Sequence, residues 1–123
     1  MSGILVVERS ATLSHLLSRT LQAAQYDKWS ELAGYGEAIE HLKQAARLGH
    51  PYRVLLLGAP ARPTREFNEL LGYLREVREP PLPVLLLAHE KTADVAAWID
   101  SREDSVFIPW AQFSRIPTAI RQL

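Results

Sequence analysis

The chain has 123 residues, a length typical of one domain that buries a hydrophobic core without disulfides or metals. Fourteen basic residues balance fourteen acidic ones, so the overall charge gives no reason to expect nucleic acid or an anionic membrane as a direct partner. The lack of cysteine excludes a disulfide framework and a thiolate zinc site. Because the sequence shows neither a signal peptide nor an apolar run long enough to span a membrane, we expect a cytoplasmic location.

Short apolar runs predict the strands. Residues 4–7, 54–57 and 84–87 are unbroken apolar segments, which are typical of strands buried on both faces of a parallel sheet. Residues 26–32 indicate an edge strand that Gly34 and Gly36 close, and residues 105–108 predict a short fifth strand.

Apolar residues at helical spacing lie between these strands. The stripes are Leu13, Leu16, Leu17, Leu21 and Ala24; Ala38, Ile39, Leu42, Ala45 and Ala46; Phe67, Leu70, Leu71 and Leu74; Val95, Trp98 and Ile99; and Phe113, Ile116, Ile120 and Leu123. Hydroxyl residues at Ser10, Thr64 and Thr92 are expected to cap three of the helices. We expect the second helix to begin at Glu37 and the fifth near Ser114. The stretches 49–51 and 79–81, with their glycine and prolines, are expected to end the second and third helices.

Five strands that alternate with five helices predict a single α/β domain, a doubly wound parallel sheet with right-handed crossovers and helices on both faces. We find no internal repeat or linker. The last helix runs to the final residue, so the chain is either complete or a piece of a longer protein.

The hydrophobic segments resemble those of the CheY-like receiver domain of two-component response regulators. The segments that carry the resemblance are Ile-Leu-Val-Val-Glu-Arg-Ser at 4–10, Pro-Tyr-Arg-Val-Leu-Leu-Leu-Gly at 51–58, Pro-Val-Leu-Leu-Leu-Ala at 83–88 and Val-Phe-Ile-Pro-Trp at 106–110. The resemblance covers residues 1–123 and implies a flavodoxin-like (βα)5 fold with strand order 2-1-3-4-5. These matches are mostly hydrophobic, so they specify fold better than activity.

The resemblance also implies a phosphorylation site that this chain lacks. Family receivers are phosphorylated on an aspartate at the end of the third strand, beside Mg²⁺ held partly by an acidic pair after the first strand. Here the phosphoacceptor position falls on Leu57 or Gly58, and Glu8 and Arg9 replace the acidic pair. Mg²⁺ requires hard oxygen ligands, so one carboxylate beside a cation is a poor site.

Other positions of the family's phosphorylation switch differ as well. The hydroxyl residue after the fourth strand aligns with Ala88, the phosphate-pairing lysine with Ile108 and the rotating aromatic residue with Ser105, whereas the proline after the lysine remains as Pro109. We therefore interpret the chain as a degenerate receiver, or pseudoreceiver, with no catalytic residue, metal or cofactor. We call the region of Glu8, Arg9, Leu57, Gly58, Ala88, Ile108 and Pro109 the vestigial pocket.

Three aromatic residues point to an interaction surface. Trp98, Trp110 and Phe113 fall on the fourth helix, the loop after the fifth strand and the start of the fifth helix, a face that the resemblance implies is used for dimerisation or partner binding. Ser105 lies on the same face. Because tryptophan is enriched at binding hot spots, these rings either anchor a homodimer or protein partner, with Trp110 as the exposed anchor, or cap a small core. The resemblance also implies an attached kinase, cyclic-dinucleotide or DNA-binding output domain.

A second hypothesis assigns the vestigial pocket a ligand. Arg9, Ser10 and His89 would contact an anion or small molecule, although capping by Ser10 and a solvent-exposed Arg9 explain the same residues. No glycine-rich nucleotide loop, Walker loop or nucleophile elbow occurs, and no histidines have the spacing of a metal site. These absences disfavour an enzyme.

Overall fold

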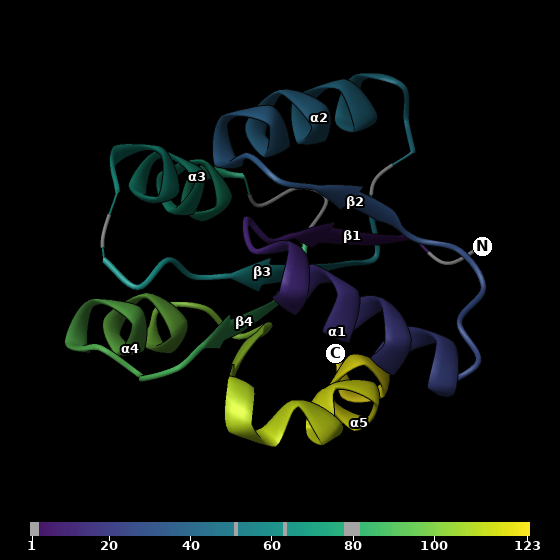
Figure 1. Cartoon of the computed structure of the whole chain (residues 1–123). Helices are drawn as coiled ribbons and strands as arrows, with labels where there is room; N and C mark the ends of the chain where they lie inside the picture. The colour runs from purple at the N-terminus through teal and green to yellow at the C-terminus, as the bar shows by residue number, and fades with distance from the viewer. Residues whose placement is uncertain (1–2, 51, 63, 78–81) are drawn as a thin grey trace.

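Five parallel strands form one sheet in the order β2-β1-β3-β4-β5, as the computed structural model shows (Figure 1). The structure describes residues 3–50, 52–62, 64–77 and 82–123. The strands are β1 (Ile4–Val7), β2 (Ser30–Leu32), β3 (Val54–Gly58), β4 (Val84–Ala88) and β5 (Ser105–Pro109). The predicted flavodoxin-like fold and strand order are confirmed.

Helices cover both faces of the sheet (Figure 1). They are α1 (Ala11–Ala23), α2 (Tyr35–Arg47), α3 (Arg65–Glu76), α4 (Ala93–Asp100) and α5 (Ile116–Gln122), and a short 3-10 helix, η1 (Trp110–Arg115), precedes α5. Among the described residues, none of the helices has the length and apolar character needed to cross a bilayer.

The central strands are apolar at every position because both of their faces are covered. Successive side chains of a strand point to opposite faces. Leu5 and Val7 of β1 therefore join the cluster under α2, α3 and α4, whereas Ile4 and Val6 join the cluster under α1 and α5. This double burial explains why β1, β3 and β4 read as continuous apolar runs.

Three helices begin at the predicted caps. The side-chain oxygens of Ser10, Thr64 and Thr92 accept hydrogen bonds from the backbone N–H groups three residues later, at 3.3, 3.1 and 3.2 Å respectively. Each cap satisfies one of the N–H groups that lack a partner at a helix start.

The predicted edge strand at 26–32 is too long, because only Ser30–Leu32 pairs with β1. The reason lies at the end of α1. Gln25 adopts a positive φ of 70°, and the N–H of Tyr26 donates to the carbonyl of Leu21 at 3.0 Å, which is the pattern of a Schellman cap. Tyr26 therefore belongs to the helix end.

The second helix begins two residues earlier than predicted, at Tyr35. Gly34 is its N-cap and Gly36 lies in the first turn, so the two glycines belong to the helix start instead of closing a strand. The ring of Tyr35 is buried, which favours this start. At the other end Gly49 has a φ of +72° and terminates the helix as expected, while Pro51 and residues 79–81 lie outside the described residues.

The fifth helix is divided. Residues 110–115 form the 3-10 helix and α5 begins at Ile116, with Pro117 in the first turn where its missing N–H costs nothing. Because of this division Phe113 does not continue the buried stripe of Ile116 and Ile120. Its side chain is exposed.

Candidate functional site

The carboxyl ends of the strands bring part of the predicted vestigial pocket together. Val7 pairs with Leu57, so Glu8 follows β1 beside Gly58, the last residue of β3. Gly58 in turn pairs with Leu87 of β4, one residue before Ala88. This edge is where parallel α/β sheets usually place their ligands.

Glu8 occupies the space in front of Gly58. Its side chain is only 6% exposed, and a Cβ atom added to Gly58 would lie 2.5 Å from Glu8 Oε1. Leu57, by contrast, is buried in the hydrophobic cluster under α2, α3 and α4. The geometry therefore favours Gly58 as the position that the resemblance gives to the phosphoacceptor, and a side chain there would collide with the carboxylate.

Burial dominates the electrostatics of Glu8. Loss of water raises the pKa of its carboxyl above the usual 4.5, and the backbone N–H groups of Ser10 and Arg9 and the charges of His89 and Arg9 only partly oppose this effect. The Arg9 side chain is itself exposed. Within the described ranges no three histidine or acidic side chains are grouped closely enough to hold a metal ion.

Tyr35 joins this edge of the sheet from α2, and sequence reasoning missed it. Its hydroxyl donates a 2.7 Å hydrogen bond to the carbonyl oxygen of Gly58. Its ring packs edge-on against Phe67 of α3, with ring centroids 5.1 Å apart. Burial, and secondarily the charge of Glu8, raise the pKa of the Tyr35 phenol. An aromatic residue between two glycines was the available signal, but it reads equally well as a turn.

The other residues of the vestigial pocket contribute no polar side chain. Ala88 and Ile108 are buried, and Pro109, at the end of β5, is half-buried. Ile108 packs into the hydrophobic cluster under α1 and α5. Among the residues of the vestigial pocket, Glu8 therefore supplies the one buried polar side chain, and the Tyr35 hydroxyl lies at the same edge.

A groove of about 480 Å³ lies between the β3–α3 and β4–α4 loops. Phe67, Leu71, Ala88 and Val95 supply apolar walls, and the exposed side chains of Asn68, His89, Glu90, Thr92 and Asp94 are among those that line it. Of the three residues in the ligand hypothesis, His89 lines this groove, whereas Arg9 and Ser10 do not. The acidic Glu90 and Asp94 disfavour an anion in it.

The predicted interaction surface is largely internal. Trp98 is 2% exposed and Trp110 is 5% exposed, so the expectation that Trp110 is an exposed anchor is wrong. Trp98 belongs to the core under α2, α3 and α4, and Trp110 belongs to the core under α1 and α5. Both tryptophans serve the core, which is the alternative that sequence reasoning left open. Phe113, at 38% exposed, is the member of the set that reaches solvent.

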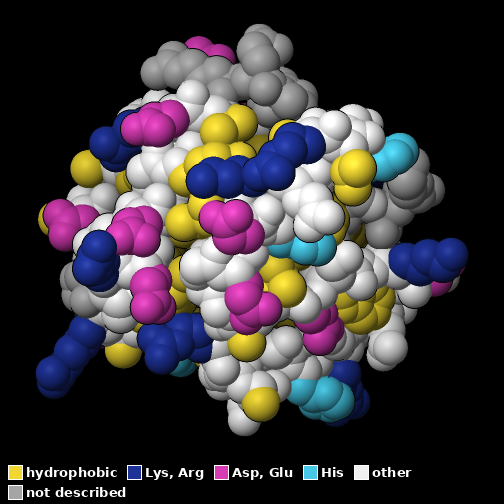
Figure 2. Space-filling view, turned by 90° about the horizontal axis from the view of Figure 1, so that it is seen from above, with side chains coloured by type: hydrophobic (Ala, Val, Ile, Leu, Met, Phe, Trp, Pro, Cys, Tyr) yellow, Lys and Arg dark blue, Asp and Glu magenta, His cyan; other side chains and the backbone are white. Residues whose placement is uncertain are grey.

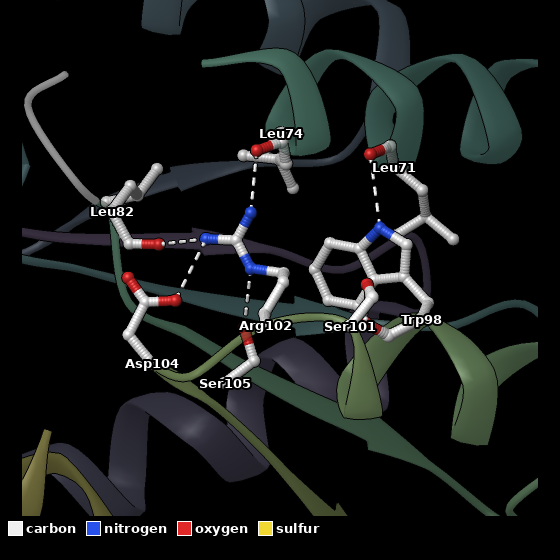
Figure 3. A network of polar contacts seen from close by, with 8 residues as sticks. All are labelled: Leu71, Leu74, Leu82, Trp98, Ser101, Arg102, Asp104 and Ser105. Atoms are coloured by element: carbon white, nitrogen blue, oxygen red, sulfur yellow. Dashed lines mark hydrogen bonds and ion pairs between the residues drawn. The ribbon is translucent and has the colours of Figure 1, made fainter. Parts of the chain in front are cut away.

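The side chain of Arg102 covers the region around Trp98 and Ser105 (Figure 3). Its guanidinium donates to the carbonyl oxygens of Leu74 at 2.6 Å and Leu82 at 2.7 Å, and to Ser105 Oγ at 2.8 Å. The group also lies over the Trp98 ring, 5.1 Å from its centroid.

The indole of Trp98 makes a second tie beside this arginine. Its Nε1 donates to the carbonyl oxygen of Leu71 in α3 at 3.2 Å (Figure 3). Together the arginine and the indole join α3, α4 and the starts of β4 and β5. The polar groups of Trp98 and Ser105 therefore hold the domain together.

No family model matches the sequence, and no curated protein matches it significantly. Solved structures do share its fold. A two-component response regulator from Cytophaga hutchinsonii has a TM-score of 0.80 at 10% identity, over 97% of this chain and 92% of that chain. A mutant receiver domain of the histidine kinase CKI1 from Arabidopsis thaliana has a TM-score of 0.75 at 14% identity, over 97% and 86%. A protein from Burkholderia pseudomallei, described as pilus assembly-related, has a TM-score of 0.67 at 16% identity, over 99% and 93%.

The chain therefore has the CheY-like fold of response regulator receiver domains. At identities this low the likeness establishes the fold and not the activity.

Proposed function

We propose that this domain is a non-catalytic pseudoreceiver of a signal transduction protein, which acts through protein contacts without being phosphorylated. The observation that carries the proposal is the position of Glu8, whose buried carboxylate fills the space in front of Gly58. Neither Gly58 nor Leu57 can accept a phosphoryl group. A side chain or phosphoryl group at position 58 would also have to displace the Glu8 carboxylate, which occupies that space.

The partner in this proposal is a protein or an attached output domain. Among the similar structures are a receiver domain of a histidine kinase and a protein described as pilus assembly-related, so the fold occurs in more than one kind of protein. Self-association is the simplest partner hypothesis and can be measured by sedimentation across a concentration series. The proposal places the protein in the cytoplasm.

Treatment with a phosphodonor tests the proposal directly. The protein is incubated with Mg²⁺ and acetyl phosphate, and separately with Mg²⁺ and beryllium fluoride, and is followed by intact mass and amide NMR spectra. A receiver domain that accepts phosphate from the same donor is treated in parallel. We expect no phosphate adduct and no shift of the amides near Glu8, whereas an adduct or a shift there would show that the pocket still works.

The groove beside His89 supports a second candidate, a small-molecule sensor. Its volume of about 480 Å³ lies within the range of ligand pockets, and its walls are mainly apolar. A ligand at 100 times its dissociation constant would add about 2.7 kcal/mol of stability. A thermal shift screen with uncharged nucleosides and with inorganic phosphate therefore tests this candidate, and the acidic rim predicts that phosphate fails.

A further inference from the structure

A second groove lies on the other side of the sheet, between α1 and the η1–α5 segment. It has a volume of about 640 Å³. The apolar residues that line it are Leu16, Ala23, Ala24, Phe113 and Pro117, and the polar ones are Arg19, Thr20, Ser114 and Arg121. The helices α1 and α5 are neighbours on this face of the sheet (Figure 1), and residues of both line the groove. We call it the α1–α5 groove.

This side of the domain is basic although the whole chain is neutral. The segments α1, η1 and α5 contain three arginines (Arg19, Arg115 and Arg121) and no acidic residue. The helices of the other layer, α2, α3 and α4, contain seven acidic residues against four basic ones. Figure 2 views the molecule from the α2 side, where acidic and basic side chains are mixed. The separation of charge is therefore between the two helical layers.

One acidic residue reaches α1 from the sheet. Glu31 of β2 contacts the hydroxyl of Ser18 and accepts a 2.8 Å hydrogen bond from Trp29 Nε1. Ser18 does not line the groove, and two donors already hold the carboxylate. Arg19 and Arg121 consequently have no carboxylate beside them in the groove lining.

Charge and shape together select the occupant. Two copies that met through this same face would bring arginines of like charge together, which disfavours a symmetric pair. A nucleic acid would neutralise the arginines but would leave the exposed ring of Phe113 and the apolar walls without a partner. An amphipathic helix with an apolar face and acidic residues beside it would satisfy both the arginines and the apolar walls.

We propose that the α1–α5 groove docks an acidic amphipathic helix of a partner protein. An apolar side chain of that helix packs against Phe113 and Leu16, and carboxylates beside it pair with Arg19 and Arg121. The inference deepens the proposed function, because it names the surface and the chemistry of the partner. It differs from the sequence-based expectation of a surface on the fourth helix, fifth strand and fifth helix, whose tryptophans are buried.

The test uses two synthetic peptides as probes. One is an amphipathic helix with leucine on one face and glutamate on the other, and the second carries lysine in place of every glutamate. Each is titrated into the ¹⁵N-labelled full chain at low and at high salt. We expect the acidic peptide to shift the amides of α1, η1 and α5, with an affinity that falls as salt rises. The basic peptide should not shift these amides.

Variants locate the binding site. Phe113→Ala and the double variant Arg19→Glu/Arg121→Glu should each weaken the acidic probe by about tenfold or more, because they remove the anchor ring and the charge pairing. Leu48→Ala is the matched control, since Leu48 is another exposed apolar side chain, 63% exposed at the end of α2. It should leave the affinity unchanged. Far-UV circular dichroism checks that every variant is folded.

Three results would overturn the proposal. They are no binding of the acidic peptide, shifts confined to α3 and α4, or equal binding of both peptides. A further assay sediments the protein with phosphatidylglycerol vesicles. If the vesicles bind the protein and neither peptide does, the groove is a membrane-docking face instead.

The titration is repeated after treatment with Mg²⁺ and acetyl phosphate. Binding that appears only after this treatment would refute phosphorylation independence and keep the groove. Absence of binding in both cases would refute the groove alone.

Discussion

The hydroxyl of Tyr35 donates a hydrogen bond of 2.7 Å to the carbonyl oxygen of Gly58, which ties the first turn of α2 to the end of β3. Both residues are buried. The bond therefore lies out of competition with water and supports the edge of the sheet where Glu8 also lies.

Tyr35→Phe removes this hydrogen bond and keeps the ring. We expect a loss of about 1 to 2 kcal/mol in the free energy of unfolding, because a buried carbonyl loses its hydroxyl donor. Urea denaturation measures the change. Tyr26→Phe is the control, since the Tyr26 hydroxyl makes no hydrogen bond within the described part of the chain. An equal loss in both variants would contradict a specific role for the Tyr35 hydroxyl.

Gly58→Ala tests the contact with Glu8. The added methyl group would lie 2.5 Å from Glu8 Oε1, so the buried carboxylate must move, at a cost of about 1 to 3 kcal/mol. In a Glu8→Ala background the obstructing group is gone. The loss of unfolding free energy caused by Gly58→Ala should therefore be smaller there than in wild type, by at least about 0.5 kcal/mol. Denaturant unfolding of the four proteins completes the cycle. Additive losses would show that the two side chains do not compete for one space.

The raised pKa of Glu8 makes stability depend on pH. The folded state holds this proton more tightly than the unfolded state, so the contribution of Glu8 is fully present below pH 4.5 and is lost as pH rises through the folded pKa. Wild type should therefore lose stability relative to Glu8→Gln as pH is raised above 4.5. Thermal unfolding of both proteins across this range measures the difference, and a carboxyl NMR titration gives the pKa of Glu8 itself. A difference that shrinks with rising pH would mean that the pKa is lowered.

Arg102→Lys tests the polar network that joins α3 to β4. Lysine cannot reproduce the fork that reaches the Leu74 and Leu82 carbonyls, so we expect a loss of about 1.5 to 3 kcal/mol in the free energy of unfolding. The matched control is Arg65→Lys, whose partner Glu69 lies one turn away on the exposed surface of α3. This control should change stability by less than about 0.5 kcal/mol. Equal effects would indicate that the Arg102 network is no stronger than a surface ion pair.

Trp110→Ala and Phe113→Ala should separate folding from binding. Trp110 is buried, so its truncation should cost about 3 to 5 kcal/mol, whereas truncation of the exposed Phe113 should cost little. Urea denaturation of both variants measures this. If the Trp110→Ala variant also failed to form an oligomer, that failure would be explained by damage to the core and would not place Trp110 in an interface. A fully stable Trp110→Ala variant would show instead that the ring adds little to the core.

Local patterns in the sequence determined most of the fold. The unbroken apolar runs at 4–7, 54–57 and 84–87 predict doubly buried strands, and the hydroxyl caps predict where three helices begin. Both signals arise from neighbouring residues, so they need no knowledge of the final packing. The sequence alone also showed that neither Leu57 nor Gly58 can accept a phosphoryl group.

Tertiary structure alone decided which of those positions lies against Glu8 and which aromatic residues reach solvent. The register of β1 on β3 places Glu8 against Gly58, and a contact between residues 50 positions apart leaves no periodic signal. Trp98, Trp110 and Phe113 are chemically alike in the sequence, but the break between η1 and α5 turns only Phe113 outward. The α1–α5 groove likewise depends on tertiary structure, because the first and last helices form it by packing on the same face of the sheet. Neither helix contains an acidic residue.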